Sequence, residues 1–381
     1  MSDVANINNL IAPLDLKVTG VKCTPRNYRY EIKLPADIDI YRKVLSQEKA
    51  IKAALEAALG TNEYSYIRKD GYIYIERKRE SFDPVPFQAF YKGLQGRKKL
   101  MLALGIDENG KKVMTDLSKA PHILVGGTTG SGKSELVHSF IHSLIETTVD
   151  LGTHIYLFDP KMSEFAVYKG CPRIQVHDNI NDMYNVMEHL VDLMEARYRE
   201  FNRVRVKDIT LYNGPMPMYP IVVIIDELAD LMMQCKAIEK PIVRIAQKAR
   251  ACGIHLIIGT QSPRRDIVTG LIKSNMLTRI ALKTTSSMES RIILDRTGAE
   301  KLYGYGDMLF LGNGSFEPIR IQSAYVSNEL KVYMSNLLKS RAPKRQKPEQ
   351  QPAPKPEQQP IQQPKTSLWR KIRNAILSGR G

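Results

Sequence analysis

The sequence has few of the features that mark membrane, secreted or metal-stapled proteins. No run of about 18 uninterrupted apolar residues occurs, so no membrane-spanning helix is expected. The first ten residues, MSDVANINNL, lack the basic-then-apolar shape of a signal peptide. The 381 residues include only four cysteines and no CxxC pair, which argues against a disulfide framework and against a zinc site. These absences favour a cytoplasmic protein with reduced thiols.

What the sequence does have is an excess of positive charge. Its 56 Lys and Arg against 40 Asp and Glu give a net charge of +16, of which residues 339–381 carry +9. Such a balance favours a polyanionic partner, either nucleic acid or an acidic membrane surface. The hydrophobic share of 43% and the charged share of 25% are typical of a globular protein, and the length suits two or three domains.

Residues 121–145, PHILVGGTTGSGKSELVHSFIHSLI, are the most informative stretch. A short apolar run at 123–125 predicts a buried strand, and the following residues match G-x-x-x-x-G-K-[ST] before a helix. Glycines let the backbone wrap a phosphate, a helix N-terminus favours the anion, and the lysine reaches the β- and γ-phosphates. A chance glycine-rich turn is the alternative, but every fixed position matches. The predicted ATP-binding residues are Gly127, Thr128, Thr129, Gly130, Ser131, Gly132, Lys133 and Ser134.

A second buried-type strand, residues 219–225, ends in Asp226-Glu227. The pattern predicts that Asp226 holds Mg²⁺ opposite the Ser134 hydroxyl and that Glu227 polarises the attacking water. The alternative is a helix N-terminus stabilised by two acids.

Further strands at 154–158 and 255–259 alternate with helices at 182–202 and 238–252, which predicts an α/β fold with a parallel sheet. Ligands of such sheets bind at the carboxyl ends of the strands. Gln261 follows one of these ends and is a candidate γ-phosphate sensor. The residues expected to meet there are the P-loop, Asp159, Asp226, Glu227, Thr260 and Gln261.

The domain boundaries follow shifts in composition. Residues 1–98 predict a small α+β domain, with a strand at 27–34, a helix at 44–59 and a hairpin around Lys69-Asp70-Gly71. Residues 99–342 form the P-loop ATPase domain. Residues 343–366 are rich in Pro and Gln and predict a flexible linker. Residues 367–381 predict a basic amphipathic helix that docks on a protein partner or a membrane surface; a disordered tail is the alternative.

The sequence strongly resembles the motor domain of the FtsK/SpoIIIE double-stranded DNA translocases between Leu104 and Leu311. The matching text includes LGIDENGKKVMTDLSKAPHILVGGTTGSGKSELV, FDPKMSEFAVYKG, VVIIDELADLMM and IVRIAQKARACGIHLIIGTQSP. Residues 1–98 resemble the α subdomain of that family. The resemblance implies a RecA-like fold, a hexameric ring, duplex DNA in the channel and ATP at subunit interfaces. It also implies that Arg250, in QKARACGIH, acts as an arginine finger on the neighbouring subunit's ATP.

The resemblance extends to the channel loops, whose basic residues grip the DNA backbone. Lys273 and Arg291 match two of them, whereas Ser262 and Ser287 stand where the family usually has a basic residue. Arg264 and Arg265 are expected to take over the role lost at Ser262. The family has a transmembrane anchor before the motor domain and a winged-helix domain after it, and neither is recognisable in this sequence. This difference favours a motor of a phage or mobile element engaged in packaging or transfer.

The sequence therefore predicts an ATPase that moves duplex DNA through a ring of identical subunits. The alternative is an FtsK-like motor that moves proteins in secretion, and the two differ in whether duplex DNA stimulates ATP turnover. A nucleotide-dependent binding module without turnover is a third possibility, which the Asp226-Glu227 pair opposes.

Overall fold

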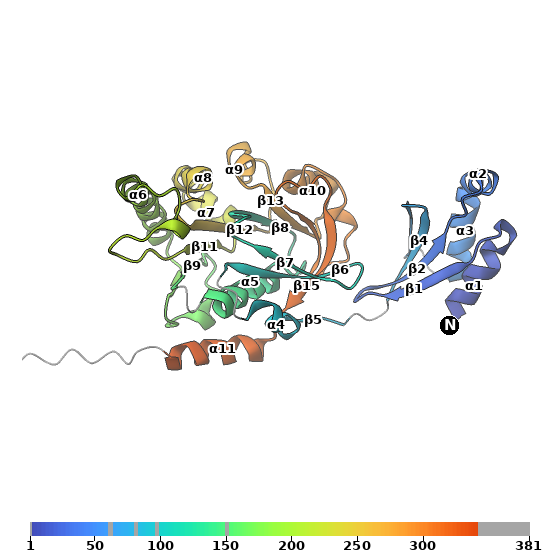
Figure 1. The fold of residues 1–381 in the computed structure, drawn as a ribbon, viewed down its shortest axis with the longest axis horizontal. Coiled ribbons are helices and arrows are strands. Elements are labelled where there is room, and N and C mark those ends of the chain that lie inside the picture. Colours follow the sequence, from blue (N-terminus) through green and yellow to red (C-terminus); the bar gives the residue numbers. More distant parts are fainter. Residues whose placement is uncertain (1, 60–63, 80–82, 96–98, 149–151, 342–381) are drawn as a thin grey trace, which may run out of the picture. The chain divides into compact units, whose positions relative to one another are not determined.

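The computed structural model describes residues 2–59, 64–79, 83–95, 99–148 and 152–341 (Figure 1). The predicted linker at 343–366 and the predicted basic helix at 367–381 lie outside the described residues. Among the helices that are described, none combines the length and the apolar content needed to cross a membrane.

The amino-terminal region forms an antiparallel sheet of strand order β1-β2-β4-β3 covered by helices. Alternate residues of the strands, such as Ile32 and Ile75, are buried and pack with Leu55 of the covering helix. The elements are α1 (Ser2–Ile11), β1 (Val18–Cys23), β2 (Asn27–Lys33), α2 (Ile38–Ser46), α3 (Glu48–Leu59), β3 (Tyr64–Lys69) and β4 (Tyr72–Lys78).

The predicted hairpin is present, but the predicted helix at 44–59 is wrong in its extent. Asp70 and Gly71 both have positive φ, 54° and 78°, as the tight turn between β3 and β4 requires. The helix is instead two helices that meet at Gln47. The first begins early because the Asp37 side chain accepts hydrogen bonds from the backbone N–H groups of Asp39 and Ile40.

The ATPase-like region is built on one large sheet of strand order β10-β9-β11-β12-β8-β13-β14-β15-β6-β7. From β10 to β13 the neighbours are parallel, as predicted; from β13 to β7 they are antiparallel. The strands are β6 (Met101–Asp107), β7 (Lys112–Asp116), β8 (His122–Gly126), β9 (His154–Phe158), β10 (Ile174–His177), β11 (Ile221–Ile225), β12 (Ile254–Thr260), β13 (Thr278–Leu282), β14 (Asp307–Leu311) and β15 (Ile319–Tyr325), with β5 (Val85–Pro86) beside β15.

Helices cover both faces of the parallel half (Figure 1). The covering helices are α5 (Lys133–Thr148), α6 (Ile180–Val204), α7 (Leu228–Gln234), α8 (Glu239–Lys248), α9 (Gly270–Asn275) and α10 (Ser287–Leu294). The single turn α4 (Tyr91–Leu94) lies beside α5, and α11 (Asn328–Arg341) contacts α5 through Lys331 and Glu135. The predicted helix at 182–202 is α6, two residues longer at each end. The predicted helix at 238–252 is α8, which ends at Lys248 because the backbone turns there toward β12.

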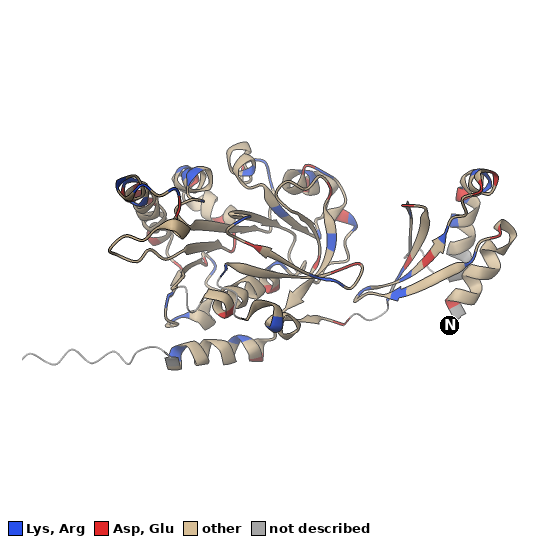
Figure 2. Cartoon of the chain, viewed as in Figure 1, with Lys and Arg blue, Asp and Glu red and all other residues tan. Residues whose placement is uncertain are grey.

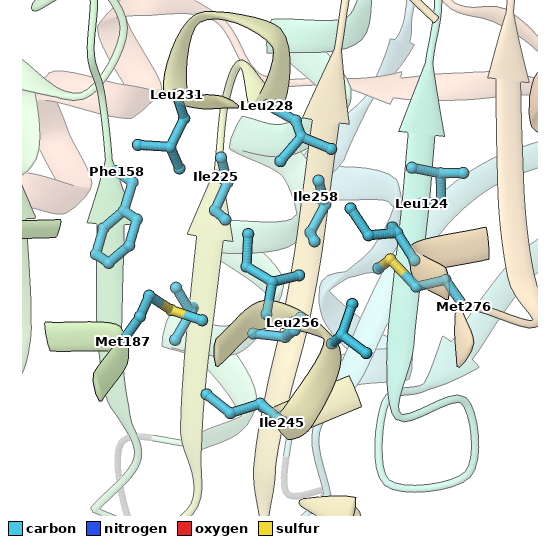
Figure 3. Close-up of a cluster of buried hydrophobic side chains, with 14 of the residues drawn as sticks. Leu124, Phe158, Met187, Ile225, Leu228, Leu231, Ile245, Leu256, Ile258 and Met276 are labelled. Carbon is cyan, nitrogen blue, oxygen red and sulfur yellow. The ribbon is translucent and has the colours of Figure 1, made fainter. Parts of the chain in front are cut away.

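The side chains of the central strands alternate between two apolar cores. Leu124, Ile225 and Ile258 pack under α6, α7 and α8, and Figure 3 shows this cluster. Their neighbours Ile123 and Ile257 point to the opposite face, toward α5. Because both faces are buried, these strands contain continuous apolar runs, which is why the sequence identified them.

Candidate functional site

The P-loop lies between the carboxyl end of β8 and the amino end of α5. Two of its glycines have backbone angles that L-residues rarely adopt, with φ of 76° at Gly130 and 99° at Gly132. A Cβ atom at Gly132 would lie 2.4 Å from the backbone nitrogen of Gly306. The P-loop is therefore closely packed against the segment around Gly306. Gly132 has no room for a side chain, and the positive φ angles favour glycine at both positions.

The predicted lysine and the predicted magnesium carboxylate are in direct contact. Lys133 Nζ lies 2.7 Å from Asp226 Oδ1, and both side chains are almost fully buried. Burying two opposite charges is tolerated when they are paired at this distance. The contact confirms that β8 and β11 bring these two residues to the same edge of the sheet although 93 residues separate them.

Glu227 lies beside Asp226 and is held by three hydrogen bonds. Thr260 Oγ1 donates to Glu227 Oε1 (2.8 Å), the backbone N–H of Gln261 donates to Oε2 (2.8 Å) and that of Ala229 donates to Oε1 (3.2 Å). The last contact makes Glu227 the N-cap of α7. The alternative interpretation of the sequence is an acid that stabilises a helix N-terminus. Glu227 does cap α7, and it also lies beside Asp226 and the P-loop.

Gln261 reaches the P-loop from the end of β12. The Thr129 hydroxyl donates to Gln261 Oε1 at 2.8 Å, and both side chains line the same pocket. Because the Gln261 backbone also binds Glu227, the residue connects the P-loop to the second carboxylate. This is the position expected of a group that responds to the terminal phosphate.

The side chains fit a triphosphate and Mg²⁺. Within the described chain, the Ser131 hydroxyl is buried and has no hydrogen-bond partner, as suits a donor reserved for a phosphate. The Ser134 hydroxyl and the Asp226 carboxylate would supply the hard oxygen ligands that Mg²⁺ prefers. The described residues contain no group of three or more His, Cys, Asp or Glu side chains that could hold a metal ion by themselves.

Glu164 is a site residue that the sequence did not identify. It lines the pocket with Lys133 and Ser134, and the His138 side chain, with Ser134 also contributing, holds the pKa of its carboxyl below the usual value. The turn that delivers it is closed by Asp159, whose carboxylate accepts from the backbone N–H of Glu164 (2.9 Å) and Phe165 (3.0 Å). Asp159 therefore shapes this turn, and the prediction that it joins the pocket lining is not supported by its contacts.

The pocket continues beyond the P-loop and encloses about 590 Å³, a volume ordinary for a small-molecule site. The second part of its lining comes from the antiparallel half of the sheet and the segment before β5. These residues are Pro84, Tyr305, Gly306, Gln322, Ser323 and Tyr325.

Three of the four predicted DNA-binding residues come together at one hollow of about 450 Å³. Arg265, Lys273 and Arg291 line it with Met288 and Asp295. Lys273 Nζ lies 2.6 Å from Asp295 Oδ1, so part of its charge is balanced within the chain. The fourth, Arg264, is exposed and lies 3.4 Å from Asp266.

Arg250 does not join the pocket of its own chain. It is exposed and precedes β12, whereas Gln261 follows the other end of that strand. A seven-residue strand spans roughly 20 Å, so Arg250 lies at the opposite edge of the sheet from the P-loop. The helix that precedes it in the chain, α8, carries Lys and Arg side chains (Figure 2).

A P-loop between a buried strand and a helix, paired with a carboxylate at the end of another parallel strand, defines a P-loop ATPase fold. Solved structures agree. The conjugation coupling protein TcpA of pCW3, in its monomer form with ATPγS, superposes with a TM-score of 0.63 at 23% identity over 89% of this chain and 99% of its own. The cytoplasmic domain of the type VII secretion ATPase EccC from Thermomonospora curvata gives 0.59 at 22% identity over 68% and 35%.

The chain belongs to the FtsK/SpoIIIE family, whose model matches residues 92–221 and 215–265. It is 39% identical to a DNA translocase FtsK of Sporosarcina ureae over 82% of this chain and 42% of that protein. It is 45% identical to the DNA translocase SftA of Bacillus subtilis over 61% and 25%. The chain thus spans less than half the length of these relatives.

Proposed function

We propose that the protein is an ATP-driven translocase of double-stranded DNA that works as a ring of identical subunits, by family analogy a hexamer. The observation that supports this proposal is that the P-loop contacts both segments that lead to the basic hollow, which is the hollow lined by Arg265, Lys273 and Arg291. Lys133, Asp226, Glu227 and Gln261 supply the ATPase site, and the hollow supplies the contact with the phosphate backbone. The role in a phage or mobile element stays a prediction of the sequence.

In the proposed reaction, Lys133 and the P-loop backbone bind the β- and γ-phosphates, and Glu227 accepts a proton from the attacking water. Ser134 and Asp226 would hold Mg²⁺, which would supply positive charge to neutralise the phosphates. Glu227 lies between β11 and β12 at the edge where the P-loop ends, but both of its oxygens accept hydrogen bonds and it does not line the open pocket. It must therefore exchange one of these bonds to reach the attacking water.

The first connection from the P-loop to the hollow runs through Gln261. Thr129 binds the Gln261 side chain, and Arg264 and Arg265 follow three and four residues later. A change in the phosphate contacts of Gln261 is therefore transmitted over a short segment to two basic side chains.

The second connection runs through Lys283 at the end of β13. The backbone N–H of Thr128 donates to the Lys283 carbonyl at 2.9 Å, and the Thr128 hydroxyl also contacts that oxygen. The chain then enters α10, which carries Arg291. Both connections start in the P-loop and end at residues of the same hollow, which supports a coupling of ATP turnover to DNA movement.

The double variant Lys273→Ala with Arg291→Ala tests the DNA contact. We expect its ATP turnover without DNA to remain near the wild-type level and its stimulation by duplex DNA to be lost, because two phosphate contacts are removed. The measurement is steady-state ATP hydrolysis with and without blunt duplex at two salt concentrations.

A matched control removes two exposed lysines elsewhere, Lys111→Ala with Lys119→Ala, and should retain stimulation. Full stimulation of the Lys273 and Arg291 variant would contradict the assignment of the hollow. Absence of any duplex stimulation in the wild-type protein would favour the alternative, a motor that moves proteins.

A further inference from the structure

The loop Gly304-Tyr305-Gly306 has an unusual backbone. All three residues have positive φ, of 90°, 51° and 89°. Two glycines adopt such angles freely, but a tyrosine does so rarely and at a cost. Tyr305 is therefore held in an unfavourable conformation by its surroundings.

The loop is fixed to the P-loop on one side. The backbone N–H of Tyr305 donates to the Gly130 carbonyl (3.3 Å), and that of Gly306 donates to the Ser131 carbonyl (2.6 Å). On the other side, the Tyr305 carbonyl accepts from Gln322 Nε2 (3.0 Å) and from an Arg26 guanidinium nitrogen (2.6 Å). These contacts fix the backbone of Tyr305 relative to the phosphate-binding loop.

The Tyr305 side chain gains little stabilising free energy from burial when the chain folds. Its relative exposure is 69%, so burial of the ring does not offset the strained backbone. The residue nevertheless lines the nucleotide pocket with Pro84 and Tyr325, beyond the residues that serve the phosphates. An exposed aromatic ring on a backbone that is fixed beside a phosphate-binding loop is suited to stack on a flat, apolar ligand group.

We propose that Tyr305 is the platform on which the base of the bound nucleotide stacks. The proposal rests on the ATP binding of the proposed function and assigns its base end. Every nucleobase has a π-face, so the platform strengthens binding of ATP, ADP and GTP alike. It contributes nothing to the phosphates, which the P-loop holds.

The test compares Tyr305→Gly with the wild-type protein. Glycine adopts a φ of 51° without strain, so this variant removes the ring and leaves the backbone path unchanged. Calorimetric titrations measure the affinities for ATP, ADP and inorganic tripolyphosphate. We expect the affinities for ATP and ADP to fall about tenfold and that for tripolyphosphate to stay unchanged. Tyr305→Phe, which keeps the ring, should bind all three as the wild type does.

Unchanged ATP affinity in Tyr305→Gly would overturn the proposal. An equal loss for tripolyphosphate would also overturn it, because the loop would then act only by supporting the P-loop. A wild-type protein that binds neither ATP nor tripolyphosphate would overturn the proposed function and this inference together. Tyr305→Phe should match the wild type in thermal unfolding, because the ring is exposed and the backbone is unchanged. Tyr305→Gly should remain folded, with the backbone strain at this position relieved.

Discussion

The variant Glu227→Gln is expected to bind ATP about as well as the wild-type protein and to hydrolyse it roughly 10³-fold more slowly. Glutamine has the shape of glutamate but cannot accept a proton from water. Its carbonyl oxygen can accept the hydrogen bonds of one carboxylate oxygen, but its amide nitrogen cannot accept those of the other, so the fold of the variant is checked by thermal unfolding. Single-turnover hydrolysis and equilibrium binding of ATP separate the two effects.

The control for this variant is Glu195→Gln, which makes the same chemical change on α6, where Glu195 pairs with Arg244. It should leave turnover unchanged. If Glu227→Gln hydrolysed ATP at half the wild-type rate or faster, Glu227 would have only its structural role as the cap of α7.

The second large effect is expected for Arg250→Ala, which should lose about 10³-fold in turnover, as arginine fingers do. The expectation comes from the family resemblance. The location of Arg250 is compatible with it, because an arginine so far from the P-loop of its own chain could act only on the site of a neighbouring copy. In the proposed ring with head-to-tail contacts, each interface would combine the P-loop of one copy with Arg250 of the next.

Mixing two inactive variants tests this sharing directly. Lys133→Ala lacks a working P-loop but keeps Arg250, and Arg250→Ala has the reverse defect. In an equal mixture about one interface in four contains both working parts, so turnover should reappear. A mixture as inactive as its components would show that each copy uses its own Arg250 or none at all. The isolated variants, measured at the same total concentration, are the controls.

The site residues that could be predicted from the sequence are those that directly follow a buried strand along the chain. The P-loop, the Asp226-Glu227 pair and Gln261 each follow a continuous apolar run, and parallel strands bring such ends together. Lys133 in contact with Asp226, and Thr129 in contact with Gln261, confirm the predicted arrangement. Of the four predicted DNA-binding residues, three line the same hollow and Arg264 does not.

The remaining part of the pocket depends on contacts distant in the sequence. Tyr305 and Gln322 reach it through the antiparallel strands β14 and β15, whose order in the sheet no local pattern encodes. Glu164 was missed because its position depends on a turn closed by Asp159. The break between α2 and α3 at Gln47 has no glycine or proline to indicate it.

The most direct test of the central claim, that ATP turnover moves the protein along duplex DNA, is displacement of a third strand from a blunt duplex. With ATP and Mg²⁺, the wild-type protein should release the third strand, and the Glu227→Gln variant should release none under the same conditions. A wild-type protein that hydrolyses ATP at the same rate with and without duplex, and leaves the third strand bound, would contradict the claim.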